Sequence, residues 1–202
     1  MAYMKTIILD NGHGQDTPGK RSPKWKDGTQ LFEWEFSRDV VRHTEGKLKS
    51  RGFDVRVIVP EVNDISLGER VRRTNAICKE KGAGNCLFAS VHANGGGGTG
   101  FEVYTTRGKT KSDDFATVIY EEAVKMWGND WRIRTDGTDG DPDKEADFTV
   151  IKGANCPAVL IEYFFMDTER DCRYIMSQEG RDACAEVLTR AIVRYCNQSN
   201  KA

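Results

Sequence analysis

The 202-residue chain has little that would direct it to a membrane or to nucleic acid. Its 30 basic and 31 acidic residues leave a formal charge of −1, so no whole-molecule field attracts nucleic acid or an anionic lipid surface. No apolar stretch approaches the ~20 residues that cross a bilayer. The start of the chain has only the short run at residues 6–9 before Asp10, which is too short for a signal-peptide core. We therefore expect no nucleic-acid partner, no membrane insertion and no secretion signal.

Cysteine is present, but not in a pattern that makes a disulfide framework or a thiolate metal site. A chain of this length buries a sizeable core without covalent staples, and no two cysteines have the two-residue spacing of a zinc-binding pair. We interpret them as buried free thiols, which favours synthesis in a reducing cytoplasm. The cysteines are Cys78, Cys86, Cys156, Cys172, Cys184 and Cys196.

Short apolar runs alternate with amphipathic stretches, a pattern typical of an α/β sheet covered by helices. Ser66 is a predicted helix N-cap, with Glu69 three residues later. The apolar spacing predicts helices over residues 33–50, 66–82, 113–127 and 179–197, and strands over residues 6–9, 53–59, 86–91, 100–104 and 158–161.

Three polar residues, His13, His92 and Glu162, stand at or just past the ends of short apolar runs. These runs have the length and composition of strands buried on both faces. In open α/β sheets the carboxyl ends of the strands form the functional edge. Two imidazoles and a carboxylate gathered there, with a further acid nearby, suit a zinc hydrolase in which one carboxylate transfers a proton.

A lone histidine at a strand end is more often a polar residue bonded to backbone than a metal ligand. The chain has only three histidines, however, and two of them occupy matching strand ends. Glycines on both sides of His13, and the run of glycines at 95–98 after His92, leave room for an ion and a ligand. His43 lies inside the predicted helix and is interpreted as structural. The pair is therefore a predicted metal site.

Residues 128–147 form a polar segment rich in glycine and aspartate. As a calcium loop starting at Asp139 it has Lys144 where the sixth position needs glycine and Val150 where the twelfth needs glutamate, so calcium is rejected. Long polar loops in compact domains are more often functional than idle. We hypothesise that this segment walls a substrate groove.

Four sequence motifs, in order along the chain, carry a family resemblance. They are Ile8-Leu9-Asp10-Asn11-Gly12-His13-Gly14, Asp64-Ile65-Ser66-Leu67-Gly68-Glu69-Arg70, Ala89-Ser90-Val91-His92-Ala93-Asn94 and Pro157-Ala158-Val159-Leu160-Ile161-Glu162, with an acidic residue opening a helix between the first two. Over residues 5 to about 195 the chain resembles the zinc-dependent N-acetylmuramoyl-L-alanine amidases of the Amidase_3 family, in a form similar to single-domain phage lysins. The resemblance implies one α/β domain, residues 1–202, with a twisted, mostly parallel central sheet flanked by helices.

The resemblance also implies roles for individual residues. His13 and His92 match the zinc-binding histidines, and Glu162 matches the catalytic glutamate. The third ligand is chosen between two acids: the family places it four residues ahead of an asparagine, where Ser37 stands here, which selects Glu33. Glu35 would lie about 200° further round the helix, so only one of the two can face the ion.

Some positions depart from the family pattern. Asn11 stands where proline is usual, Ser37 replaces asparagine, and aromatic residues follow Glu162 where many relatives have glycine. None of these changes removes a ligand or the catalytic acid. They bear on substrate preference and on the groups that support the ligands.

The implied activity is zinc-dependent hydrolysis of the amide between N-acetylmuramic acid and L-alanine in peptidoglycan. Two alternatives stay open: a zinc peptidase that cleaves another peptidoglycan amide, and a non-catalytic wall-binding protein. Only residues 197–202 follow the last predicted helix, so we expect no separate wall-binding domain. We expect a monomer made in the cytoplasm that reaches the wall after membrane permeabilisation or lysis. Candidate substrate contacts are Asn94 and the basic cluster Lys20, Arg21, Lys24 and Lys26.

Overall fold

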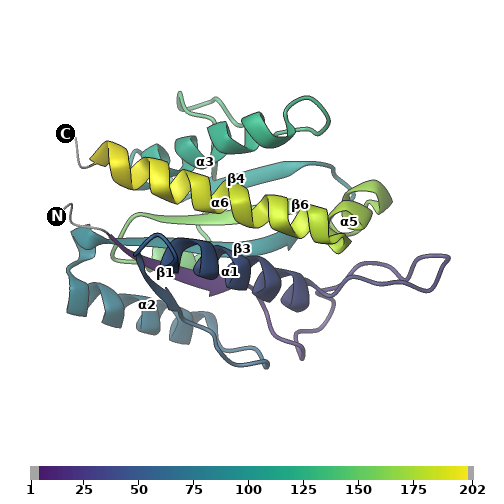
Figure 1. Ribbon diagram of the computed structural model, residues 1–202, viewed down its shortest axis with the longest axis horizontal. Coiled ribbons are helices and arrows are strands. Elements are labelled where there is room, and N and C mark those ends of the chain that lie inside the picture. Colours follow the sequence, from purple (N-terminus) through teal and green to yellow (C-terminus); the bar gives the residue numbers. More distant parts are fainter. Residues whose placement is uncertain (1–4, 200–202) are drawn as a thin grey trace.

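The computed structural model describes residues 5–199 and contains one six-stranded sheet with helices on both faces (Figure 1). The strands lie in the order β2-β1-β3-β6-β4-β5. All neighbouring pairs are parallel except β4 and β6, which are antiparallel. The predicted α/β fold with a mostly parallel sheet is confirmed. The strands are β1 (Thr6–Asn11), β2 (Asp54–Val57), β3 (Cys86–Asn94), β4 (Phe101–Thr105), β5 (Lys144–Glu145) and β6 (Ala158–Phe165).

Three long helices cover one face of the sheet, and two shorter ones cover part of the other. Helix α6 packs between α1 and α3, and α1 and α6 cross in front of the strands in Figure 1. On the opposite face α2 packs against α4. The helices are α1 (Glu33–Lys49), α2 (Leu67–Lys81), α3 (Lys111–Trp127), α4 (Thr149–Lys152), α5 (Glu169–Met176) and α6 (Gln178–Ser199), and a 3₁₀ turn, η1, covers Ala83–Asn85.

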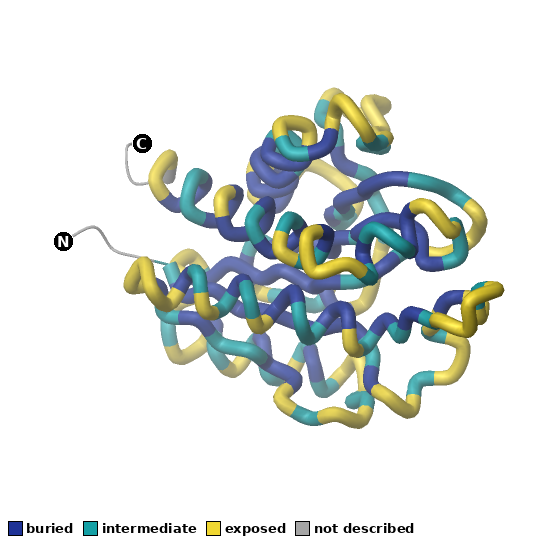
Figure 2. The backbone as a smooth tube through the Cα atoms, turned by 45° about the vertical axis from the view of Figure 1, so that its right-hand side comes forward, coloured by how far each residue is buried: buried dark blue, intermediate teal, exposed yellow. Residues whose placement is uncertain are grey.

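Strand alternation decides which side chains meet which helices. Successive residues of a strand point to opposite faces. Ile7 and Leu9 join the core under α1, α3 and α6, whereas Ile8 joins a second core with residues of α2 and α4. Asp10 is two residues after Ile8 on β1, and Ser90 and His92 are two and four residues after Phe88 on β3. They therefore lie on the same face of the sheet as Ile8 and Phe88, the face that α2 covers. The tube in Figure 2 shows the central strands buried along nearly their whole length.

Most predicted elements are found, with shifted ends. Ser66 caps α2 by accepting a hydrogen bond from the amide of Glu69 at 3.2 Å. Helix α3 begins at Lys111, two residues before the predicted start, because Thr110 and Asp113 form a capping box. The predicted strand 53–59 is shorter, at Asp54–Val57. Helices α4 and α5 and the two-residue strand β5 were not predicted, since each is too short to show a clear period.

The expectation that His92 and Glu162 sit at strand ends is corrected. Strand β3 continues to Asn94 and β6 to Phe165, so both residues lie inside strands, directly opposite each other in the register. A register irregularity follows between His92 and Asn94. Only His13 lies beyond the end of its strand.

Other expectations about the whole chain have different outcomes. The six cysteines are buried and free, as predicted. Within residues 5–199 no helix is long and apolar enough to cross a membrane. The predictions about a secretion signal and a short tail depend in part on residues 1–4 and 200–202, which lie outside the described residues.

Candidate metal centre

His13, Glu33 and His92 form a compact group of potential metal ligands. One ligand atom from each residue lies within 4.8 Å of the others. Glu33 Oε1 is 3.0 Å from His92 Nδ1 and 3.4 Å from His13 Nε2. The two imidazole rings meet edge to face with their centroids 5.0 Å apart. Two imidazole nitrogens and a carboxylate oxygen that converge in this way are the donor set of a catalytic zinc site.

Three separate elements deliver these side chains. His13 follows β1 and has a left-handed backbone with φ of 61°, which turns its ring back towards β3. A methyl group at Gly12 would lie 2.2 Å from Cε1 of the His92 ring, so only glycine allows the first strand to pass this close. Glu33 is the first residue of α1, and its Oε1 also accepts a hydrogen bond from the amide of Ala93 at 3.2 Å.

Glu162 lies on β6 opposite His92 of β3. Burial, the largest influence, raises the pKa of its carboxyl to about 7, and nearby acids add to this while His92 opposes it. Its Oε2 atom is buried and has no hydrogen-bond partner among the described residues. A buried carboxyl with a pKa near neutrality can both take and give a proton at physiological pH.

Burial and mutual contacts shift the pKa values of His13, His92 and Glu33. Burial lowers the pKa of His13 to about 4, so this imidazole is neutral at pH 7 and has a lone pair for a metal. Burial alone would lower the pKa of His92 and raise that of Glu33, but their mutual hydrogen bond and charge attraction win, so the His92 pKa is raised and the Glu33 pKa is lowered. Glu33 Oε2 is buried without a hydrogen-bond partner in the described part of the chain.

The group opens into a cavity of about 340 Å³. Lys20 lines it, with its ammonium 3.8 Å from Glu33 Oε2, whereas Arg21, Lys24 and Lys26 are not among the lining residues. The full lining set comprises Asp10, His13, Lys20, Asp64, Leu67, Arg70, His92, Asp147, Phe148, Thr149, Val150, Leu160 and Glu162.

Three other predicted contributors are placed differently. Asn94 is not among the lining residues, and its side-chain amide donates to Glu102 at 3.0 Å. Of the segment 128–147, only Asp147 lines the cavity, and the wall continues through the first residues of α4. Glu35 is exposed and outside the ligand group, while Glu33 is buried within it, as the helical angle between them requires.

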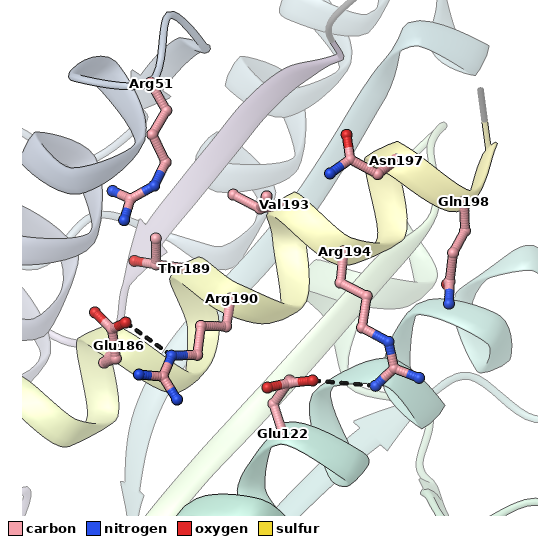
Figure 3. Close-up of a pocket in the computed structure, with 9 residues that line it drawn as sticks. All are labelled: Arg51, Glu122, Glu186, Thr189, Arg190, Val193, Arg194, Asn197 and Gln198. Carbon is pink, nitrogen blue, oxygen red and sulfur yellow. Dashed lines mark hydrogen bonds and ion pairs between the residues drawn. The ribbon is translucent and has the colours of Figure 1, made fainter. Parts of the chain in front are cut away.

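A larger hollow lies on the helical side of the molecule, beside α6 (Figure 3). Both of its acids are paired with arginines: Arg190 donates to Glu186 at 2.8 Å and Arg194 donates to Glu122 at 3.1 Å. It contains none of the histidines. Because both acids of this hollow are already paired and no histidine lines it, the smaller cavity is the candidate site.

Sequence reasoning did not identify a set of buried polar residues behind His92. Ser90 Oγ lies 3.0 Å from His92 Nε2 and donates to Asp10 at 2.6 Å, and Asp10 is paired with Arg70. The signal was present, because Asp10 and Ser90 share strand parity with His92 and Arg70 closes the second motif. Only the fold shows that these motifs meet.

Comparisons with known proteins place the chain beside N-acetylmuramoyl-L-alanine amidases and an endolysin. The sequence profile of the family described as N-acetylmuramoyl-L-alanine amidase matches residues 7–194. The chain is 28% identical to an endolysin of Bacillus phage SPP1, over 98% of this chain and 68% of the endolysin. It is 27% identical to the N-acetylmuramoyl-L-alanine amidase CwlM of Bacillus licheniformis, over 98% of this chain and 72% of that protein. The crystal structure of an N-acetylmuramoyl-L-alanine amidase from Clostridium difficile 630 superposes with a TM-score of 0.79 at 24% identity, covering 96% of this chain and 98% of that one.

Proposed function

The chain belongs to the N-acetylmuramoyl-L-alanine amidase family, and we propose that His13, Glu33 and His92 bind its catalytic zinc ion while Glu162 transfers the proton. The family's reaction is hydrolysis of the amide that joins N-acetylmuramic acid to L-alanine in peptidoglycan. The observation that carries the proposal is the convergence of three ligand atoms within 4.8 Å of one another, with one free carboxyl on the neighbouring strand.

The donor set fits zinc rather than calcium or magnesium. Zinc accepts imidazole nitrogen and carboxylate oxygen as ligands and is usually four-coordinate, so three protein ligands leave one coordination position open. Glu33 Oε2, buried without a hydrogen-bond partner in the described residues, is an acceptor that an ion would satisfy. When bound, zinc supplies an electrophilic centre that polarises a carbonyl and acidifies water.

Glu162 is suited to handle the proton in both halves of the reaction. Its carboxyl, with a pKa raised to about 7 by burial, takes a proton from the attacking water in its ionised form. The same group then donates that proton to the leaving alanine nitrogen, which breaks the amide and restores the carboxylate. Because the carboxyl is buried, little bulk water screens its electrostatic interactions with the groups that exchange the proton.

The cavity walls offer partners for the rest of the substrate. Leu67 and Phe148, 54% and 39% exposed, are two of the large apolar side chains that the surface shows, and both line the cavity. We infer that they contact the lactyl and alanyl methyl groups beside the scissile amide. Lys20 places a cation at the same opening, where it pairs with a stem-peptide carboxylate.

We further propose that the enzyme works as a monomer, since the ligand group and Glu162 are brought together within a single chain. The site of action we propose is the cell wall, reached after the membrane has been breached. Light scattering of the purified protein tests the first inference. Lysis of cells with and without prior membrane permeabilisation tests the second.

The test of the proposed roles compares two variants with the wild type. Glu162→Gln keeps the three ligands and is expected to bind zinc while losing turnover on purified peptidoglycan; His13→Ala is expected to lose both. Zinc content is measured by elemental mass spectrometry and turnover by release of soluble wall fragments. A Glu162→Gln protein with near wild-type turnover would contradict the assignment of the proton carrier, and a His13→Ala protein with full zinc content would contradict the ligand set.

A further inference from the structure

A buried chain of polar contacts runs from helix α2 to the far side of the His92 ring. The Arg70 guanidinium is paired with Asp10 Oδ1, and Asp10 Oδ2 accepts a hydrogen bond from Ser90 Oγ at 2.6 Å. Ser90 Oγ lies 3.0 Å from His92 Nε2. The Arg70 and Asp10 side chains are only 3% and 1% exposed, and Ser90 is fully buried.

Counting protons along this chain fixes the direction of each bond. A carboxylate paired with arginine has no proton and can only accept. The single hydroxyl proton of Ser90 is therefore donated to Asp10. Ser90 Oγ is left with lone pairs facing His92, so the Ser90–His92 contact requires a proton on Nε2 of the imidazole. In the metal-free protein Nδ1 shares a proton with Glu33 Oε1. As a metal ligand the imidazole would carry only one proton, which the Ser90 contact holds on Nε2, so that Nδ1 has the lone pair.

The free lone pair points to the ligand group. His92 Nδ1 is the nitrogen that lies 3.0 Å from Glu33 Oε1. We propose that Asp10 and Ser90 are positioning residues that hold His92 in the Nε2-protonated tautomer, so that Nδ1 is presented to the metal. This proposal rests on the metal site of the proposed function and adds to it the groups that prepare one ligand. Partners of this kind orient metal-binding histidines and raise their basicity.

Helix α2 contributes Arg70, which holds Asp10 in place at the start of this chain of contacts. Arg70 Nη1 also donates to the backbone carbonyl of Asn11 at 2.9 Å, and its Nη2 donates to Asp64 Oδ1 at 2.7 Å. A buried carboxylate is costly unless it is paired. Arg70 therefore offsets the burial of the Asp10 carboxylate at the end of β1, where Oδ1 accepts from Arg70 and Oδ2 accepts the Ser90 hydroxyl proton, so that this hydroxyl turns away from His92.

The direct test is the protonation of the His92 ring in the wild-type protein. Nitrogen NMR of histidine-labelled, zinc-loaded wild-type protein, with each ring assigned through its correlations to the backbone, shows which ring nitrogen carries hydrogen. The expected result is hydrogen on Nε2 and metal on Nδ1 of His92. Hydrogen on Nδ1 with metal on Nε2 would overturn the proposal.

Variants test whether the chain of contacts causes this state. In Asp10→Asn the side-chain amide can donate to Ser90, which frees the Ser90 hydroxyl to donate to Nε2 and favours the opposite tautomer. Zinc affinity, measured by competition with a chelator, is expected to fall about 10- to 100-fold. Ser90→Ala removes the hydroxyl that accepts from Nε2. Its zinc affinity is expected to fall by a similar factor, and both tautomers of His92 are expected in the metal-free variant at high pH. Glu61→Gln takes away the carboxylate that pairs with Arg73, a neighbouring arginine of α2 outside the cavity lining, and serves as the control, with unchanged tautomer and zinc affinity.

The outcomes separate this proposal from the proposed function. Unchanged zinc affinity and an unchanged His92 tautomer in both Asp10→Asn and Ser90→Ala would refute the positioning role while leaving the metal site intact. If Asp10→Asn does not fold, Ser90→Ala and the wild-type measurement decide. If the wild type binds no zinc, the proposed metal site fails, and a smaller share of hydrogen on Nε2 of metal-free His92 in Ser90→Ala than in the wild type still tests the Ser90 contact.

Discussion

Replacing Glu162 by glutamine is expected to stabilise the metal-free protein increasingly as the pH rises. The ordinary pKa of this carboxyl is 4.5, and burial raises it to about 7 in the folded protein. Between these values the folded protein holds a proton that the unfolded chain releases. The free energy of unfolding of the wild type therefore falls as pH rises through this window, and the loss is complete above pH 7. Glutamine does not titrate, so the variant escapes this loss.

The magnitude follows from the size of the pKa shift. Each pKa unit corresponds to about 1.4 kcal/mol, so a shift from 4.5 to about 7 sets an upper limit of about 3.5 kcal/mol on the change in the stability difference between variant and wild type. A constant term from burying an amide in place of a carboxyl adds equally at every pH and does not affect the slope.

Urea unfolding of both proteins in the presence of a chelator, at pH 5, 6, 7 and 8, measures this difference. All other titrating groups are shared and cancel in the comparison. Glu35→Gln is the matched control, because Glu35 is exposed, and its stability difference is expected to stay flat with pH. A flat or shrinking difference for Glu162→Gln would refute the claim that burial at this position opposes ionisation.

Three further changes test the geometry of the site. Loss of a residue that only supports a ligand weakens zinc binding about 10- to 100-fold, and Glu33→Gln is expected to weaken it by more than this, because Glu33 is itself a proposed ligand. Glu35→Gln is expected to leave zinc affinity unchanged. Titration against a chelator measures both affinities, and equal losses would contradict the choice of Glu33. Gly12→Ala is expected to disrupt the site and lower the thermal midpoint, because its methyl group would overlap an imidazole ring, whereas Gly46→Ala in α1 meets open space and should stabilise the protein by about 0.5–1 kcal/mol. Lys20→Met is expected to raise KM several-fold with little change in zinc content, and an unchanged KM on peptidoglycan would remove Lys20 from substrate binding.

The strands and long helices could be predicted from the sequence because their apolar periods are clear. Residues 86–91 and 158–161 are continuous apolar runs, and both are central strands of the sheet. The ends were less predictable, since β3 continues through His92 to Asn94 by pairing with β6, and pairing is not visible in one segment alone. Helix α3 shows the same limit, because its start depends on the side-chain cap at Thr110.

The candidate site was predictable where spacing within one element decides. The helical angle separates Glu33 from Glu35, and the structure buries the first and exposes the second. Contacts between motifs were not predictable in this way. Arg70 of α2 pairs with Asp10 of β1, and Asn94 of β3 donates to Glu102 of β4, because both contacts depend on how separate elements pack together.

The most direct test of the proposed chemistry is mass spectrometry of the soluble products released from intact peptidoglycan by the zinc-loaded protein, beside the Glu162→Gln variant. The account predicts free stem peptides that begin with L-alanine from the wild type and none from the variant. Fragments cut within the peptide would contradict the bond assigned here, and equal release by the variant would contradict the role of Glu162.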